Sequence, residues 1–122
     1  MKYEKTSLFT FVIHRFRDGD TVEGFLRCEC CRSVSYDTIR IQKIESWEIA
    51  SPDRAKALET AKYLTSHYRG TSGILTTRSL RRDLYGRILA DVVIEGTALS
   101  LQLVTMGRAW WGVGEPEPGP QS

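Results

Sequence analysis

Short β-type segments, interrupted by one long helical pattern, set the fold that we expect of this chain. Three segments rich in aromatic and β-branched residues come first, and two more follow the helical segment. The predicted strands are Leu8–Phe16, Thr21–Leu26, Tyr36–Ile41, Ile74–Arg78 and Arg87–Ile94. In the third strand Ile39 and Ile41 share one face, so Arg40 points to the other, away from the core.

Two helices are predicted. Ser51-Pro52-Asp53 indicates a helix start, with a capping hydroxyl, a proline at the first helical position and an acid near the positive end of the helix dipole. Apolar residues then recur at spacings of three or four, at Ala57, Ala61, Leu64 and Tyr68. Gly70 is placed to end this helix, and a second helix over about Thr97–Met106 ends at Gly107.

The order β-β-β-α-β-β-α, with five short strands, matches the plan of an OB-type barrel. We therefore predict a five-stranded α+β OB-fold whose sheet is closed or nearly closed, a fold that often binds oligonucleotides on its outer face. One domain is expected over residues 1–112. Residues 113–122 carry Glu115-Pro116-Glu117-Pro118-Gly119-Pro120 and are predicted to form a solvated tail.

Composition excludes several classes of protein. The net charge of +2 is too small for a protein that holds nucleic acid by charge alone, and no apolar run is long enough to span a bilayer. No secretory leader is recognised, so we expect a cytoplasmic protein, and we expect it to be a monomer. Cysteines at Cys28, Cys30 and Cys31 form an odd, tightly spaced set, which fits a reducing compartment better than a disulfide framework.

Acidic residues cluster at predicted strand ends. Asp18 and Asp20 flank a glycine, a pattern that is common in tight turns but also supplies the oxygen ligands that Ca²⁺ prefers. Glutamates in loops are usually solvated, yet Glu45 and Glu48 could contribute ligands to the same site.

Arg40 and Arg87 form a candidate pair for phosphate. Two guanidinium groups that meet at one phosphate give bidentate hydrogen bonds and stabilise charge in a transition state. Their spacing does not show whether they meet, and each alone reads as a surface arginine. Carboxylates and arginines on an OB-type plan favour phosphodiester hydrolysis.

Together these segments resemble the staphylococcal nuclease-like (thermonuclease) family. The segments that carry the resemblance are Asp18-Gly19-Asp20-Thr21, Arg40 followed by Glu45-Ser46-Trp47-Glu48, Asp83-Leu84-Tyr85-Gly86-Arg87-Ile88-Leu89-Ala90, and Leu103-Val104 with Gly107 and Ala109. They stand in the family's order from about Leu8 to Trp111.

The resemblance implies an OB-fold nuclease that hydrolyses DNA or RNA with Ca²⁺ or another divalent cation and leaves 3′-phosphate ends. It places Asp20, Glu45 and the backbone carbonyl of Ser46 at the metal and Asp18 behind them.

The same resemblance assigns the catalytic roles. It matches Glu48 to the general base that activates water and Arg40 and Arg87 to the groups that hold the phosphate. Tyr85 matches a residue that lines the nucleotide site. Such a division of roles is chemically sensible, because cationic groups offset charge on the phosphate while a carboxylate accepts the proton of water.

Three positions depart from the family pattern. Glu45 stands for an aspartate and is one methylene longer, which predicts slower turnover or an altered metal preference. Trp47 replaces a proline before Glu48 and is expected to hold the loop by packing or to stack on a base. Leu84 replaces a basic residue.

Two alternatives to a nuclease stay open. One is an OB-fold nucleic-acid-binding module that has weakened or lost catalysis, suggested by Glu45 and Trp47. The other is a zinc or redox protein centred on the cysteine hairpin, although a closed zinc site needs four ligands. Trp110 and Trp111 could close the end of the barrel or stack on bases.

Overall fold

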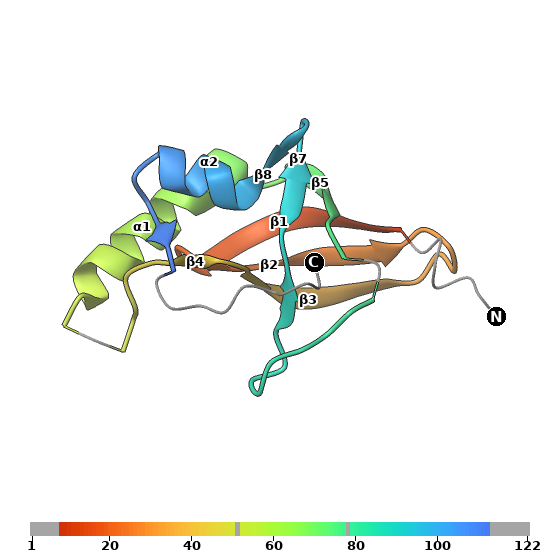
Figure 1. Cartoon of the computed structure of the whole chain (residues 1–122), viewed down its shortest axis with the longest axis horizontal. Helices are drawn as coiled ribbons and strands as arrows, with labels where there is room; N and C mark the ends of the chain where they lie inside the picture. Colours follow the sequence, from red (N-terminus) through yellow and green to blue (C-terminus); the bar gives the residue numbers. More distant parts are fainter. Residues whose placement is uncertain (1–7, 51, 78, 113–122) are drawn as a thin grey trace.

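The computed structural model describes residues 8–50, 52–77 and 79–112 and places a mixed sheet beside two helices (Figure 1). The strands are β1 Phe9–Asp18, β2 Thr21–Cys28, β3 Val34–Ile41, β4 Ile44–Glu45, β5 Ser72–Leu75, β6 Ile88–Ala90, β7 Val92–Ile94, β8 Thr97–Ala98 and β9 Trp110–Trp111, and the helices are α1 Arg54–Tyr68 and α2 Leu99–Thr105. The predicted OB-type α+β fold is confirmed. The predicted tail over 113–122 lies outside the described residues.

An antiparallel meander of β1, β2 and β3 forms the body of the sheet. Alternation along the strands sends Phe11 and Ile13 of β1 inward, and a register shift after Ile13 makes Phe16 the next buried residue. Ile39 and Ile41 are fully buried, as the sequence predicts, while the Arg40 side chain between them keeps 20% of its surface exposed.

The seven-stranded sheet is ordered β6-β3-β2-β1-β5-β7-β8. Within the described residues its edge strands β6 and β8 do not pair with each other, so the fully closed form of the predicted barrel is not found. The predicted strand Arg87–Ile94 is instead two strands, β6 parallel to β3 and β7 antiparallel to β5, joined at Asp91. The Asp91 carboxylate accepts hydrogen bonds from the backbone of Val92 (2.9 Å) and Ser100 (3.1 Å) and from the Ser100 hydroxyl. This residue therefore turns the chain from one side of the sheet to the other.

The first helix begins later than its sequence signal indicates. Pro52 lies in a turn and α1 starts at Arg54, so proline does not occupy the first helical position. The predicted cap Ser51 lies outside the described residues. The end is as predicted, because Gly70 takes a left-handed conformation (φ 85°) just after the helix.

The second helix packs beside the first. α2 is shorter than predicted because Thr97–Ala98 pair with β7 as β8 before the helix starts. The Tyr68 hydroxyl of α1 donates to the Gln102 side chain of α2 at 2.7 Å. Buried Leu64, Leu99 and Leu103 join the sheet side chains in one core.

Candidate active site

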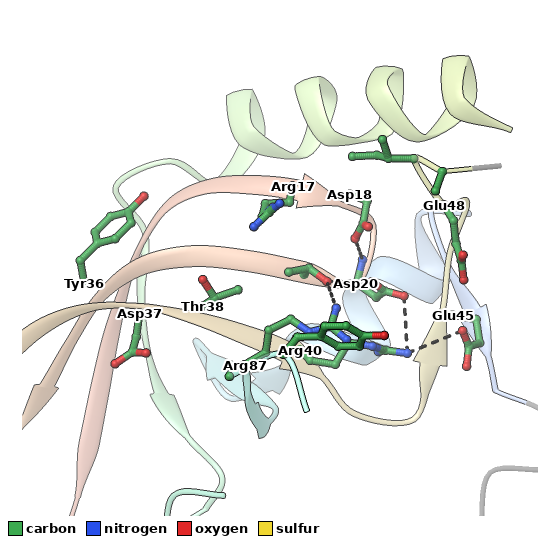
Figure 2. A pocket seen from close by; sticks show the side chains of 15 residues that line it. Arg17, Asp18, Asp20, Tyr36, Asp37, Thr38, Arg40, Glu45, Glu48 and Arg87 are labelled. Carbon is green, nitrogen blue, oxygen red and sulfur yellow. Dashed lines mark hydrogen bonds and ion pairs between the residues drawn. The ribbon is translucent and has the colours of Figure 1, made fainter. Parts of the chain in front are cut away.

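An open cleft of about 790 Å³ forms where the β1–β2 turn, the end of β3, the segment after β4 and the turn before β6 meet (Figure 2). All but one of the residues predicted for the site line it: Asp18, Asp20, Arg40, Glu45, Glu48, Tyr85 and Arg87. Ser46 is the exception, because its side chain is buried and its hydroxyl donates to the Arg108 carbonyl at 2.9 Å.

The Asp18-Gly19-Asp20 turn packs tightly against Ser46. A Cβ atom on Gly19 would lie 1.9 Å from the Ser46 hydroxyl oxygen and 2.9 Å from the Arg108 carbonyl oxygen. Only glycine fits there, so the turn packs directly against the buried serine. Within the turn, the Asp20 backbone N–H donates to the Asp18 carboxylate at 3.1 Å.

Asp20 is a buried carboxylate whose charge is incompletely compensated. Burial, followed by hydrogen bonding and repulsion from Asp18, raises the pKa of Asp20 to about 7. Arg40 and the hydroxyl of Thr21, which donates to Asp20 at 3.0 Å, act in the opposite direction but do not cancel the effect. A further positive charge beside Asp20 would therefore be strongly favoured.

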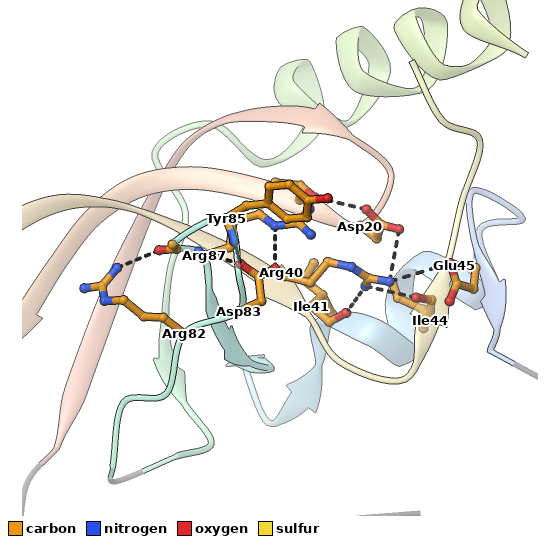
Figure 3. Close-up of polar contacts among 11 residues, drawn as sticks. Asp20, Arg40, Ile41, Ile44, Glu45, Arg82, Asp83, Tyr85 and Arg87 are labelled. Carbon is orange, nitrogen blue, oxygen red and sulfur yellow. Dashed lines mark hydrogen bonds and ion pairs between the residues drawn. The ribbon is translucent and has the colours of Figure 1, made fainter. Parts of the chain in front are cut away.

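Arg40 is held between backbone carbonyls and carboxylates at the end of β3. Its Nη1 donates to the carbonyl oxygens of Ile41 and Ile44, the latter at 3.0 Å. Its Nη2 lies 3.6 Å from a carboxylate oxygen of Asp20 and 3.6 Å from one of Glu45 (Figure 3). The carbonyl contacts fix the guanidinium, so the two acidic groups meet a cation whose position is already set.

Arg87 is held by an aspartate that the sequence reasoning did not single out. The Asp83 carboxylate accepts hydrogen bonds from Arg87 Nε at 2.8 Å and from the Arg87 backbone N–H at 2.9 Å. It also accepts one from the Tyr85 backbone N–H. Gly86 takes a positive φ of 82°, which lets this short turn close. An aspartate four residues before an arginine, with a glycine between, is a signal that could have identified Asp83.

The two arginines do meet in one cleft. Arg87 Nη1 donates to the Thr21 hydroxyl at 3.2 Å, Thr21 donates to Asp20, and Asp20 approaches Arg40 (Figure 3). The convergence that spacing alone could not establish thus follows from the parallel pairing of β3 with β6, which sets Arg40 opposite Leu89.

Tyr85 and Leu84 form the exposed rim of the turn before β6. The Tyr85 side chain is largely exposed, and the centre of its ring lies 5.4 Å from the guanidinium carbon of Arg87. Leu84 is 97% exposed at the position where a basic residue is expected. Tyr85 therefore offers an aromatic face to a ligand in the cleft, whereas Leu84 does not line it.

Trp47 packs within the protein beside the loop that carries Glu48. Its ring lies edge-on to Trp110 at 5.2 Å between centroids, and the Lys56 ammonium lies 5.1 Å from its centre. Trp110 and Trp111 form β9, which pairs with β4 and so holds Glu45 opposite Trp110. Of the two expectations for Trp47, the structure therefore shows packing within the protein.

The donor set of the cleft suits a hard cation. Asp20, Glu45 and Glu48 offer the carboxylate oxygens that Ca²⁺ prefers, and the raised pKa of Asp20 marks negative charge that a cation would offset. Across the described ranges, no group of three or more His, Cys, Asp or Glu side chains is close enough to hold a metal ion by itself. A bound cation would therefore need backbone, water or substrate oxygens as well.

The cysteines lie away from the cleft, where β2 turns into β3. Cys28 is partly buried and ends β2, whereas Cys30 and Cys31 are exposed, and all three are free thiols. The Cys31 sulfur lies 3.2 Å from the Ser33 hydroxyl.

Comparisons with known proteins agree with the geometry. A family model described as staphylococcal nuclease homologue matches residues 38–119, which include Arg40, Glu45, Glu48 and Arg87. No match was found among curated proteins. Within the described part of the chain, neither helix could cross a membrane. The match covers more than half of the chain, which therefore belongs to the staphylococcal nuclease homologue family.

Proposed function

We propose that this protein is a metal-dependent nuclease that hydrolyses the phosphodiester bonds of DNA or RNA. The observation that carries the proposal is the convergence of Arg40 and Arg87 on one cleft with Asp20 between them. Two fixed guanidinium groups recognise a phosphate that carries negative charge and gains more in the transition state. The nearly balanced charge of the chain suits such a site better than it suits binding by charge alone.

Each group in the cleft has a role in this proposal. Arg40 and Arg87 bind the non-bridging oxygens of the scissile phosphate, and Glu48 takes a proton from the attacking water. The water oxygen bonds to phosphorus as the P–O5′ bond breaks, so the phosphate stays on the 3′ oxygen and the 5′ oxygen takes up a proton and leaves as a hydroxyl. Tyr85 lines the nucleotide site. Asp20, Glu45 and the Ser46 carbonyl would hold a Ca²⁺ ion, with Asp18 supporting Asp20. When bound, the ion would supply positive charge beside the phosphate.

Cleavage of single-stranded DNA or RNA in the presence of Ca²⁺ tests the proposal. We expect cleavage by the wild type, its loss with a chelator, and a fall of at least about 100-fold in Arg87→Ala and Glu48→Ala. Arg81→Ala is the matched control, because it removes an arginine from the same segment that does not line the cleft. Full activity in both cleft variants would overturn the proposal.

A binding module without hydrolysis is the second candidate. It is favoured by the contacts of Asp20 and Glu45, which both approach Arg40. It is also favoured because the described residues contain no group of three His, Cys, Asp or Glu side chains that could hold a metal ion. Such a protein would bind oligonucleotides with a strong dependence on salt and cleave none in Ca²⁺, Mg²⁺ or Mn²⁺. Cleavage that appears only in Glu45→Asp would show that the longer side chain detunes the site.

A further inference from the structure

An exposed aromatic cluster lies on the outer face of the meander, beside the cleft. His14 of β1, Phe25 of β2 and Tyr36 of β3 have ring centroids 5.0 to 6.1 Å apart, and we call these three residues the aromatic platform. Phe25 is 45% exposed and Tyr36 48% exposed. Val12 pairs with Phe25, and Phe25 with Tyr36, so a row of exposed apolar side chains crosses three strands.

A chain of hydrogen bonds fixes the platform. Arg69 donates to His14 Nε2 at 2.9 Å, so the histidine proton sits on Nδ1, which faces the Tyr36 hydroxyl at 2.8 Å. Tyr36 in turn donates to Glu23 at 3.3 Å. Alternation along β1 places His14 on the outward face with Val12, because Phe11 and Ile13 point inward. Both rings that the chain reaches are thereby pre-organised.

The charge around the platform is positive. Arg15 and Arg17 both pair with Glu23, at 2.8 and 3.4 Å, and their side chains are more than half exposed while that of Glu23 is 11% exposed. Two exposed guanidinium groups therefore surround one largely buried carboxylate, that of Glu23. The adjoining groove between β1 and α1 is lined by Arg15, Arg17, Lys62 and Arg69, and no acidic residue of the described part of the chain lines it.

The platform is continuous with the cleft. Arg40, Thr38 and Tyr36 alternate along β3 and share one face, and Figure 2 shows Tyr36 at the opposite end of the cleft from Glu45. Four residues of strand cover about 13 Å, which is the length of about four stacked nucleotides. Arg17 lines both the cleft and the groove.

We propose that the aromatic platform is a second binding region for single-stranded nucleic acid, occupied by the nucleotides that extend from the cleft. Bases stack on Phe25 and Tyr36, and phosphates contact Arg15, Arg17 and Arg69. Stacking on exposed rings requires bases whose faces are not covered by pairing, so the substrate class is single-stranded DNA or RNA. This inference rests on the nuclease proposed above, since it extends the same cleft.

Binding of a fluorescent 12-residue oligothymidylate, measured by anisotropy in a chelator, tests the platform without cleavage. Phe25→Leu keeps apolar area but removes the ring, and we expect about tenfold weaker binding, whereas Phe25→Tyr keeps the affinity. Leu101→Ala is the matched control, because Leu101 is equally exposed (47%) but lies on α2. Arg69→Gln is expected to reduce the slope of log K against log salt by about 0.7.

Several outcomes would overturn the proposal that the aromatic platform binds single-stranded nucleic acid. They are no binding by the wild type, equal binding by Phe25→Leu and the wild type, or a dimer in sedimentation that Phe25→Ala dissociates, which would assign the face to a second copy. If Phe25→Leu does not fold, as judged by circular dichroism, an unchanged salt slope in Arg69→Gln overturns it instead. Wild-type protein that binds the oligonucleotide but cleaves nothing with Ca²⁺, Mg²⁺ or Mn²⁺ would refute the nuclease and leave the binding region beside the cleft standing.

Discussion

The Asp83 carboxylate accepts hydrogen bonds from both the guanidinium group and the backbone N–H of Arg87, at 2.8 and 2.9 Å. Because the same carboxylate also orders the turn at Tyr85, the arginine reaches the cleft on a rigid support. Asp83 is therefore a positioning residue in the proposed site, acting through Arg87.

Asp83→Asn should lower the kcat/KM of DNA cleavage by about 10- to 100-fold, because Asn keeps the backbone contacts but loses the ion pair that aims the guanidinium. The free energy of unfolding should fall by less than about 1 kcal/mol, since the pair is partly exposed. Steady-state kinetics and urea unfolding measure both. Glu59→Gln, which removes the ion pair between α1 and Arg108 in the segment after α2, should leave cleavage unchanged. Wild-type kcat/KM in Asp83→Asn would refute the positioning role.

The close approach of Gly19 to Ser46 leads to a second prediction. Gly19→Ala places a methyl group within 1.9 Å of the Ser46 hydroxyl oxygen and should destabilise the protein by about 1–3 kcal/mol. Ser46→Gly removes the two nearest colliding atoms and leaves only the Arg108 carbonyl oxygen at 2.9 Å, so the double variant should be more stable than the sum of the single effects predicts. Urea unfolding of all four proteins gives this coupling energy. Strictly additive effects would show that the collision is relieved in another way.

The cysteine hairpin gives a third prediction. Hydrogen bonds from Ser33 and Cys28 lower the pKa of the exposed Cys31 thiol to about 7. The rate at which iodoacetamide modifies Cys31, followed by peptide mass spectrometry, should therefore rise with a midpoint near pH 7. Ser33→Ala should move that midpoint up toward 8.5, the ordinary value for cysteine. A wild-type midpoint above pH 8 would contradict the prediction.

Patterns within single segments predicted the strands of the meander and the end of the first helix. Alternation located the meander and turned Arg40 away from Ile39 and Ile41, and Gly70 ended the first helix as expected. The split at Asp91 was not predicted, because β6 and β7 read as one apolar run and only their partners, β3 and β5, separate them.

The geometry of the candidate site depends on contacts that are distant in sequence. Residue types identified Arg40 and Arg87, but their convergence depends on the parallel pairing of β3 with β6, which are distant in sequence, and on the Thr21 hydroxyl between them. The platform was missed for a similar reason, since alternation turns His14 outward but only the pairing of three strands brings it beside Phe25 and Tyr36. Side-chain spacing within one segment cannot show such contacts.

The raised pKa of Asp20 gives the last prediction, for the protein without divalent cations. Folding raises this pKa from 3.8 to about 7, so between these values the folded protein holds a proton that the unfolded chain has released. The contribution of Asp20 to the free energy of unfolding is therefore full below about pH 4 and is lost as the pH rises toward 7. The hydrogen bond from Arg82 lowers the pKa of Asp37. Asp37 is therefore ionised in both states above about pH 4 and does not offset the loss of stability that Asp20 causes.

Asp20→Asn should remove that pH dependence and exceed the wild type in free energy of unfolding at pH 8 by on the order of 1–3 kcal/mol. Urea unfolding at intervals from pH 4 to pH 8 measures the difference, with Glu59→Gln as the control for an exposed carboxylate. Added Ca²⁺ should raise the melting temperature of the wild type at pH 8 more than that of Asp20→Asn, because the ion offsets the charge that destabilises the fold. Parallel stability curves for the wild type and Asp20→Asn across this range would show that Asp20 does not carry an uncompensated charge.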